Sequence, residues 1–446
     1  MSCRGRTELH RGCGLRNPAR DAGGEPAGVD ALRPEPRLSR ILRLPAGAPL
    51  SDRLFASGVE FPCGGEGICG GCRFRFPGGD WELACQATTT EAVTVEVEQW
   101  TAPPTVLTDE ASVTSIEPQG GLGYAIDLGS TTLVAQRVDL RTGEIVKIRT
   151  GINPQTRRGA DIMSRIAYDL QHPGELTDAI RRQLGALLGR QAKTAIVAGN
   201  TAMHHLFCGL SVEPLAAVPF RSPWLGAQRF TGKELNWPVD EVIVLPCIGG
   251  FVGGDTVAGL AVTPLGEGDA LVDLGTNSEV CVARAGRIRC ASTAAGPAFE
   301  SPKFRRGTHL VESVAAALAA GQVQPSGRLS GEAIEGLSQA HVRQLQLAKA
   351  AVASGLHLLG ASGTLHVAGA FGNYVRESDA KRIGLLPAGS AIQAAGNAAL
   401  RGARFLLLNP SRREQVIEEL LARTEHVELA ALPEFQDAYV SAMRFA

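Results

Sequence analysis

Four of the ten cysteines lie within 23 residues of one another, in a glycine-rich stretch near the N-terminus. They are Cys63, Cys69, Cys72 and Cys85, with five, two and twelve residues between them in order. Four thiolates are the ligand set of a 2Fe–2S cluster, two for each iron. Glycines in such a loop permit positive φ and let backbone N–H groups approach the sulfides, which stabilises negative charge. The spacing therefore predicts a 2Fe–2S cluster as the metal centre.

Zinc is the alternative metal for clustered thiolates. Structural zinc sites usually pair two short Cys-x2-Cys turns, and here only Cys69 and Cys72 form one. The spacing thus favours iron–sulfur over zinc, and over a stretch that binds no metal. The remaining cysteines are scattered, and we interpret them as structural: Cys3, Cys13, Cys208, Cys247, Cys281 and Cys290.

Two hairpins indicate a second kind of site. In each, a hydrophobic strand ends in Asp-Leu-Gly and continues with small polar residues, and the two copies are 146 positions apart. The predicted ligands are Asp127 with Gly129, Ser130, Thr131 and Thr132, and Asp273 with Gly275, Thr276 and Asn277. A strand-end Asp can hold a hydrated Mg²⁺, and the amides after it can cradle phosphate oxygens. One such hairpin is commonly an ordinary turn, but the repeat predicts two phosphate-binding loops in related halves.

A third glycine-rich element follows a predicted strand at 365–368. Its residues would let the backbone lie flat beside an adenosine, and they are Gly369, Ala370, Phe371, Gly372 and Asn373. Between the two phosphate loops, Asp255 follows a Gly-Gly-Phe-Val-Gly-Gly stretch. With Asp127 and Asp273 it is a candidate catalytic residue that orients water or Mg²⁺. The alternative is that Asp255 caps the helix that follows.

The pattern of hydrophobic residues places these motifs in separate regions. Residues 1–28 are predicted to lack fixed structure, 29–100 to form a small domain, 101–122 to be a linker and 123–446 to alternate strands with helices. Expected strands are 40–44, 73–76, 93–97, 124–128, 133–138, 194–198, 242–245, 270–274, 279–283 and 365–368. Expected helices are 50–57, 160–170, 176–191, 255–262, 342–359, 376–383 and 412–422.

Composition narrows the class of protein. The chain has 446 residues, 44% of them hydrophobic, and a formal net charge of −1. A near-neutral chain has no global basic field for nucleic acid. We also expect no membrane span, because no apolar run is long enough. The first forty residues contain no apolar signal segment, which favours the cytoplasm.

These motifs resemble two known folds. The cysteine region resembles a β-grasp 2Fe–2S ferredoxin, with five residues where plant ferredoxins have four between the first two cysteines. The ordered phosphate, phosphate and adenosine loops resemble the acetate kinase, sugar kinase, Hsp70 and actin (ASKHA) superfamily, in which two lobes close on ATP. The resemblance implies an α/β protein: an N-terminal β-grasp domain followed by a two-lobed ASKHA ATPase with ATP and Mg²⁺ as ligands.

The combination of both folds resembles the reductive activators of corrinoid proteins. Further matching stretches begin at Asn153, Gly159, Gly199, Ser292 and Gln346. The resemblance implies an ATP-hydrolysing iron–sulfur reductase that returns Co(II) to Co(I) by one-electron transfer. Its partners would be a corrinoid protein or a cobalamin-dependent methyltransferase, with methionine synthase as one such client, and an upstream electron donor. A homodimer is also implied.

Two departures from that family are expected. The chain leaves no room for a full middle domain between linker and ATPase, and the stretch after Glu300 is short, which puts nucleotide turnover in doubt. Two other functions therefore stay open. One is a kinase-like phosphotransferase in which the cluster senses redox state. The other is a plain ferredoxin-type electron carrier with a degenerate ATPase scaffold.

Overall fold

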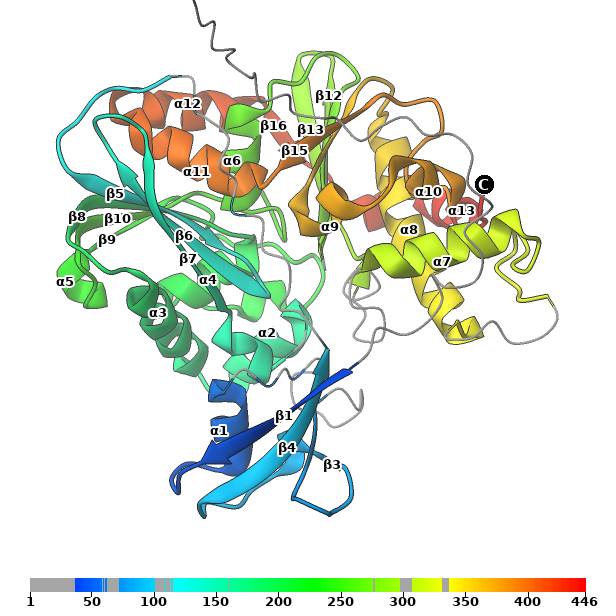
Figure 1. The fold of residues 1–446 in the computed structure, drawn as a ribbon. Coiled ribbons are helices and arrows are strands. Elements are labelled where there is room, and N and C mark those ends of the chain that lie inside the picture. Colours follow the sequence, from blue (N-terminus) through cyan, green and yellow to red (C-terminus); the bar gives the residue numbers. More distant parts are fainter. Residues whose placement is uncertain are drawn as a thin grey trace, which may run out of the picture.

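The computed structural model describes residues 37–57, 59, 61, 72–100, 108, 113, 115–159, 161–275, 277–296, 307–330 and 337–446. Within these ranges the chain forms one four-stranded sheet and two six-stranded sheets (Figure 1). Helices cover the two larger sheets, so the predicted α/β class is confirmed. The stretch 1–28, predicted to lack fixed structure, lies outside the described residues.

The small sheet forms the N-terminal module. Its elements are β1 (Arg37–Leu44), α1 (Leu50–Ala56), β2 (Arg73–Arg75), β3 (Glu82–Leu83), the short 3-10 helix η2 (Ala84–Gln86) and β4 (Val93–Trp100), with strand order β1-β4-β2-β3. Alternation along β4 buries Val95 and Val97 completely, and α1 adds Leu50 and Leu54 to the same core. A two-residue period on strands and a helical stripe are the patterns from which these elements were predicted.

The first lobe is built on the sheet β7-β6-β5-β8-β10-β9. Its strands are β5 (Leu122–Leu128), β6 (Thr132–Asp139), β7 (Ile145–Ile152), β8 (Ala192–Ala198), β9 (Gln228–Thr231) and β10 (Val239–Val244). Its helices are η3 (Pro154–Arg157), α2 (Ile162–Gln171), α3 (Glu175–Leu187), α4 (Thr201–Cys208), η4 (Glu213–Leu215), α5 (Gly232–Leu235) and α6 (Gly254–Val262). Later in the chain, α11 (Ala398–Leu408) and α12 (Pro410–Arg423) return to cover the other face of this sheet.

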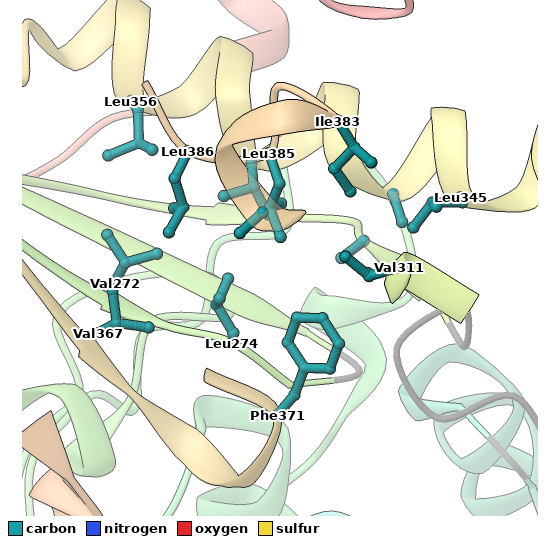
Figure 2. Packing of buried hydrophobic residues seen from close by; sticks show 14 of the residues in the cluster. Val272, Leu274, Val311, Leu345, Leu356, Val367, Phe371, Ile383, Leu385 and Leu386 are labelled. Atoms are coloured by element: carbon teal, nitrogen blue, oxygen red, sulfur yellow. The ribbon is translucent and has the colours of Figure 1, made fainter. Parts of the chain in front are cut away.

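The second lobe is built on the sheet β15-β14-β11-β12-β13-β16. Its strands are β11 (Ala270–Asp273), β12 (Ser278–Arg284), β13 (Arg287–Thr293), β14 (Leu365–Ala368), β15 (Ile392–Gly396) and β16 (Thr424–His426). Its helices are α7 (Gly307–Ala319), α8 (Gln339–Leu359), α9 (Gly369–Tyr374), α10 (Glu377–Arg382), η6 (Leu429–Ala431) and α13 (Phe435–Ala442). Figure 2 shows how Val272 and Leu274 of the β11 region pack with Val367 of β14 in the core of this lobe.

The second half of the predicted linker is fixed to the first lobe. Asn409 Nδ2 donates to the Ser115 carbonyl oxygen at 2.9 Å, and Ser411 Oγ donates to Glu117 Oε1 at 2.6 Å. Ile116 packs against the hydrophobic cluster beneath α11. Residues 115–117 of the predicted linker therefore pack as part of the first lobe.

The helix α8 fastens the C-terminus of the chain. Gln346 Nε2 donates to the carbonyl oxygens of Ser326 at 3.0 Å and Met443 at 2.8 Å, and Lys349 Nζ donates to the Arg444 carbonyl oxygen. Lys349 is almost fully buried, and its ammonium lies 5.4 Å from the centre of the Phe445 ring. The stretch that begins at Gln346, which resembles the corrinoid activators, thus has a structural role: it holds the C-terminal residues against α8.

Lys349→Met should remove a measurable pH dependence of stability. Burial lowers the Lys349 pKa from 10.5 to about 8. Because the unfolded chain keeps its proton up to a higher pH, the free energy of unfolding should rise by about 2 kcal/mol between pH 8 and 10.5. Urea unfolding of both proteins across that range measures the difference. Equal slopes for Lys349→Met and the wild type would contradict the assignment.

Candidate functional site

The structure brings the three predicted loops to one place between the two large sheets. Strand β11 pairs with β14 in parallel, with Asp273 opposite Ala368, and Leu274 N donates to the Ala368 carbonyl oxygen at 3.1 Å. From the first lobe, Asp127 at the end of β5 is joined by Asn397, whose Nδ2 donates to Asp127 Oδ2 at 2.7 Å. The separated Asp-Leu-Gly copies therefore face a common site.

Asn397 is oriented by the helix that it caps. Its Oδ1 accepts a hydrogen bond of 2.8 Å from Leu400 N in the first turn of α11, which leaves its amide N–H₂ group to bond Asp127. The residue directly follows β15 of the second lobe. Asn397 thus ties Asp127 of the first lobe to the second lobe. The sequence signal was only a generic helix cap, and the prediction missed it.

Four carboxyl groups gather at this site. Burial raises the pKa of Asp127 to about 6 and the pKa values of Asp255 and Asp273 to about 7. Burial also raises the pKa of Glu279 well above its usual range, and the charges of Asp255 and Asp273 raise it further. Within the described part of the chain none of the four forms an ion pair with Lys or Arg. The cluster therefore has no protein cation to compensate it, and a bound cation would favour the ionised form of its carboxyl groups.

Glu279 is the carboxyl group that the sequence prediction missed. It lies directly opposite Asp273 in the β11–β12 hairpin and is 7% exposed, whereas the three aspartates keep more of their surface open. Nothing in the sequence around Glu279, six positions after Asp273, indicates a ligand. Glu279 becomes part of the site because the antiparallel register returns it to the same point.

Asp255 lies in the first turn of α6 and does not cap it. The N-cap is Gly253, and Asp255 Oδ1 accepts a 2.7 Å hydrogen bond from Thr256 N. A Cβ on Gly253 would collide with the backbone of Gly199 and Asn200, so this glycine lets α6 start against the end of β8. That close approach aims Asp255 at Asp127, and the capping alternative is wrong.

The first phosphate loop is braced from behind by Asn153. Its Nδ2 donates to the Gly129 carbonyl oxygen at 2.9 Å, and its backbone N donates to the Thr131 carbonyl oxygen at 2.9 Å. Because Asn153 donates to both carbonyl oxygens, these two backbone acceptors have their hydrogen bonds within the protein. The side chains of Ser130, Thr131 and Thr132 are half-buried.

The predicted adenosine loop, residues 369–373, lies within α9. Phe371 is 7% exposed and packs in the core beside Leu274 and Val311 (Figure 2). Its ring therefore has little surface left for a ligand. Asn373 is exposed and Gly372 half-buried, and the side chain of Ala370 lies outside the described residues. Any ligand contact here falls mainly to the backbone of 369–373.

Gly369→Ala should lower both the stability of the protein and its affinity for nucleotide. Gly369 has φ +85°, and an added Cβ would collide with Asp273 Oδ1 and lie 2.6 Å from the Leu274 carbonyl oxygen. Left-handed backbone and the collision together should cost about 1–3 kcal/mol in the free energy of unfolding. Nucleotide affinity, measured by calorimetry, should fall about tenfold or more. Gly389→Ala, where a Cβ meets nothing within 4 Å, is the control; equal behaviour of both variants would contradict the prediction.

Two of the four predicted cluster ligands are described. Cys72 is buried and precedes β2, while Cys85 is half-buried in η2. The β2–β3 hairpin pairs Arg73 with Leu83, and Ala84 N donates to the Cys72 carbonyl oxygen at 2.7 Å, so both cysteines lie at one end of the hairpin. Cys63 and Cys69 lie outside the described residues, as does Thr276 of the second phosphate loop.

Among the described residues, no three His, Cys, Asp or Glu side chains are arranged to hold a metal ion by themselves. In the described ranges, no helix is both long enough and apolar enough to cross a bilayer.

The fold and the position of the loops place the chain in a class of proteins, the ASKHA proteins. The model described as the C-terminal domain of RACo, the ASKHA domain, matches residues 267–326 and 323–446, and the RACo middle-region model matches residues 122–267. The chain belongs to the family of reductive activators of corrinoid proteins. The expectation that a middle region would be missing was wrong, because residues 122–267 are that region.

Individual relatives agree with this assignment. The chain is 29% identical, over 412 aligned residues covering 71% of this chain and 69% of the relative, to the corrinoid activation enzyme RamQ of Eubacterium limosum. It is 26% identical, over 72% of this chain and 77% of the relative, to the [Co(II) methylated amine-specific corrinoid protein] reductase of Methanosarcina barkeri. A solved reductive activator for corrinoid,iron-sulfur protein shares the fold, with TM-score 0.65 and 23% identity over 93% of this chain and 80% of that one.

Proposed function

We propose that this protein is an ATP-dependent reductive activator that returns Co(II) to Co(I) in a corrinoid protein by one-electron transfer. The observation that carries the proposal is the joining, in one chain, of the cysteine-bearing module to a two-lobed body with clustered acidic loops. The family and the activities of the named relatives support it.

The cysteines would supply the redox function. Cys63, Cys69, Cys72 and Cys85 would hold a 2Fe–2S cluster, which supplies one electron per reduction. The burial of Cys72 and the position of both described cysteines at one hairpin end fit this role. An upstream donor must then return one electron to the module. Each cycle converts one Co(II) to Co(I) and oxidises that donor by one electron.

The acidic loops would supply the nucleotide function. Asp127, Asp255, Asp273 and Glu279 form an acidic cluster with no protein cation bonded to it in the described ranges, which fits a hydrated Mg²⁺ carried in by ATP. The amides after Asp127 and Asp273 would hold phosphates, and the backbone of 369–373 would lie beside the adenosine. Because Asn397 links Asp127 to the second lobe, nucleotide would bias the opening of the two lobes.

The experiment is an anaerobic mixture of this protein, ATP with Mg²⁺, a low-potential chemical donor and a Co(II) corrinoid protein. Partners to be tested include methylamine-type carriers and cobalamin-dependent methionine synthase. The Co(I) absorbance band should appear with ATP and the proper partner, and not without ATP. Phosphate transfer to a small molecule, unchanged by Cys72→Ser, would instead favour the kinase-like alternative. Reduction that is independent of ATP would favour the plain electron carrier. A homodimer and a cytoplasmic location stay predictions of the sequence.

A further inference from the structure

Arg157 of the first lobe contacts the N-terminal module. Arg157, the last residue of η3, forms an ion pair with Asp52 and donates from Nη2 to Ser51 Oγ at 3.0 Å. Its guanidinium also lies 6.0 Å from the centre of the Phe55 ring and 5.5 Å from that of Phe61. Figure 1 shows α1 of the module beneath the α2 corner of the lobe.

Arg157 also lies near a predicted cluster ligand. Ser51 N donates to the Ala87 carbonyl oxygen at 3.0 Å, which places α1 beside η2 and Cys85. Burial lowers the Arg157 pKa, and the neighbouring Asp52 carboxylate acts in the opposite direction. Arg157 Nη1 is buried and has no hydrogen-bond partner among the described residues. A buried, unpaired donor at this contact is a group that an anionic metal centre held by Cys85 would satisfy.

The other end of the same short helix holds the first phosphate loop. Asn153 is the N-cap of η3 and makes the bonds to Gly129 and Thr131 described above, while Arg157 is the last residue of η3. Asn153, which contacts the loop, and Arg157, which contacts the module, are therefore only four positions apart. One short element thus carries both the contact with the loop and the contact with the module.

We propose that Arg157 is a positioning residue that docks the cysteine module on the first lobe, raises the reduction potential of its metal centre and links both to the first phosphate loop. The proposal rests on the proposed function only for the presence of the cluster. A cation near an anionic iron–sulfur centre favours its reduced form, because reduction adds negative charge. The ion pair, the hydrogen bond and the two ring contacts are each weak, so docking through them is reversible.

The first arm measures docking by small-angle X-ray scattering of the full chain without corrinoid partner. Arg157→Ala should raise the undocked fraction about tenfold and increase the radius of gyration. Arg158→Ala is the matched control, since Arg158 is exposed and stacks on Tyr168 of its own lobe at 5.1 Å. The exchange of charges in Asp52→Arg with Arg157→Asp should restore the compact form. Equal scattering of Arg157→Ala and the wild type would overturn the docking role.

The second arm measures the reduction potential by spectroelectrochemistry. Arg157→Ala should have a lower midpoint potential, Arg157→Lys should recover most of the difference, and Arg158→Ala should leave it unchanged. Saturating Mg²⁺ and a non-hydrolysable ATP analogue should shift the wild-type potential and leave that of Arg157→Ala unmoved. An identical potential in wild type and Arg157→Ala, or a nucleotide shift retained in the variant, would overturn the proposal. If no 2Fe–2S spectrum is found, the proposed function fails, while the scattering arm still tests the dock.

Discussion

Cys72→Ser and Cys85→Ser are each expected to abolish electron delivery while the nucleotide half of the molecule continues to bind its ligand. Hydroxyl groups replace thiolates poorly as ligands of iron in such clusters, so each variant should lose most of about two irons per chain together with the visible absorbance of the cluster. Nucleotide affinity should stay within about twofold of the wild type, because the acidic loops lie in the other two sheets.

The control for this prediction is Cys208→Ala. Cys208 lies at the end of α4, where burial and the neighbouring Cys247 raise its thiol pKa, so it is an inert cysteine outside the predicted set. It should keep its iron and its activity. Full iron content in Cys72→Ser, measured by chemical analysis and by electron paramagnetic resonance of the reduced protein, would show that the ligand set is wrong.

Asp273→Asn should weaken nucleotide binding and at the same time stabilise the protein. The amide keeps the shape of the side chain but removes a charge that Mg²⁺ needs, so affinity for the Mg²⁺ nucleotide should fall about a hundredfold. In the free protein the same charge is unfavourable, since burial and the charges of Asp255 and Asp127 raise the Asp273 pKa from 3.8 to about 7.

The direction of the stability change follows from these pKa values. The unfolded chain releases the Asp273 proton near pH 4 and the folded chain near pH 7, so the wild type loses stability as pH rises through that window. Asp273→Asn lacks this loss and should be more stable by about 4 kcal/mol at pH 7, with the difference vanishing near pH 4. Urea unfolding at both pH values measures it, with the exposed Asp240→Asn as control. A variant that is less stable than the wild type at pH 7 would contradict the electrostatic account.

The strands and loops that carry chemistry were predictable because each has a local signal. Continuous hydrophobic runs that end in Asp-Leu-Gly define β5 and β11, and the glycine spacing marks the turn after β14. The helix α11 had no such signal. Nine of its eleven residues are buried, so its sequence shows no polar face. Gly402 meets the Ala258 carbonyl of α6 so closely that a Cβ would collide, a contact invisible in sequence.

The parts of the site that sequence reasoning missed are set by tertiary contacts. Glu279 joins the acidic cluster through strand register, and Asn397 through the return of the chain from the second lobe to the first. Asn153 was noticed only as part of a matching stretch, and its bonds to the first phosphate loop give that stretch a physical reason. The sequence did not separate the middle region, residues 122–267, from the lobe that follows. Strands and helices alternate in the same way through both, so they were predicted as one domain.

One single-turnover measurement tests the central claim most directly. The protein is reduced by a stoichiometric donor, freed of excess reductant and mixed anaerobically with its Co(II) corrinoid partner, and the electron paramagnetic resonance signals of both centres are followed. With Mg²⁺ and ATP, the signals of the reduced 2Fe–2S cluster and of Co(II) should decline together, one for one, as the Co(I) absorbance band grows. Without nucleotide, or in Asp273→Asn, both signals should persist. Loss of the Co(II) signal at the same rate and extent with and without ATP would contradict nucleotide-gated delivery of one electron.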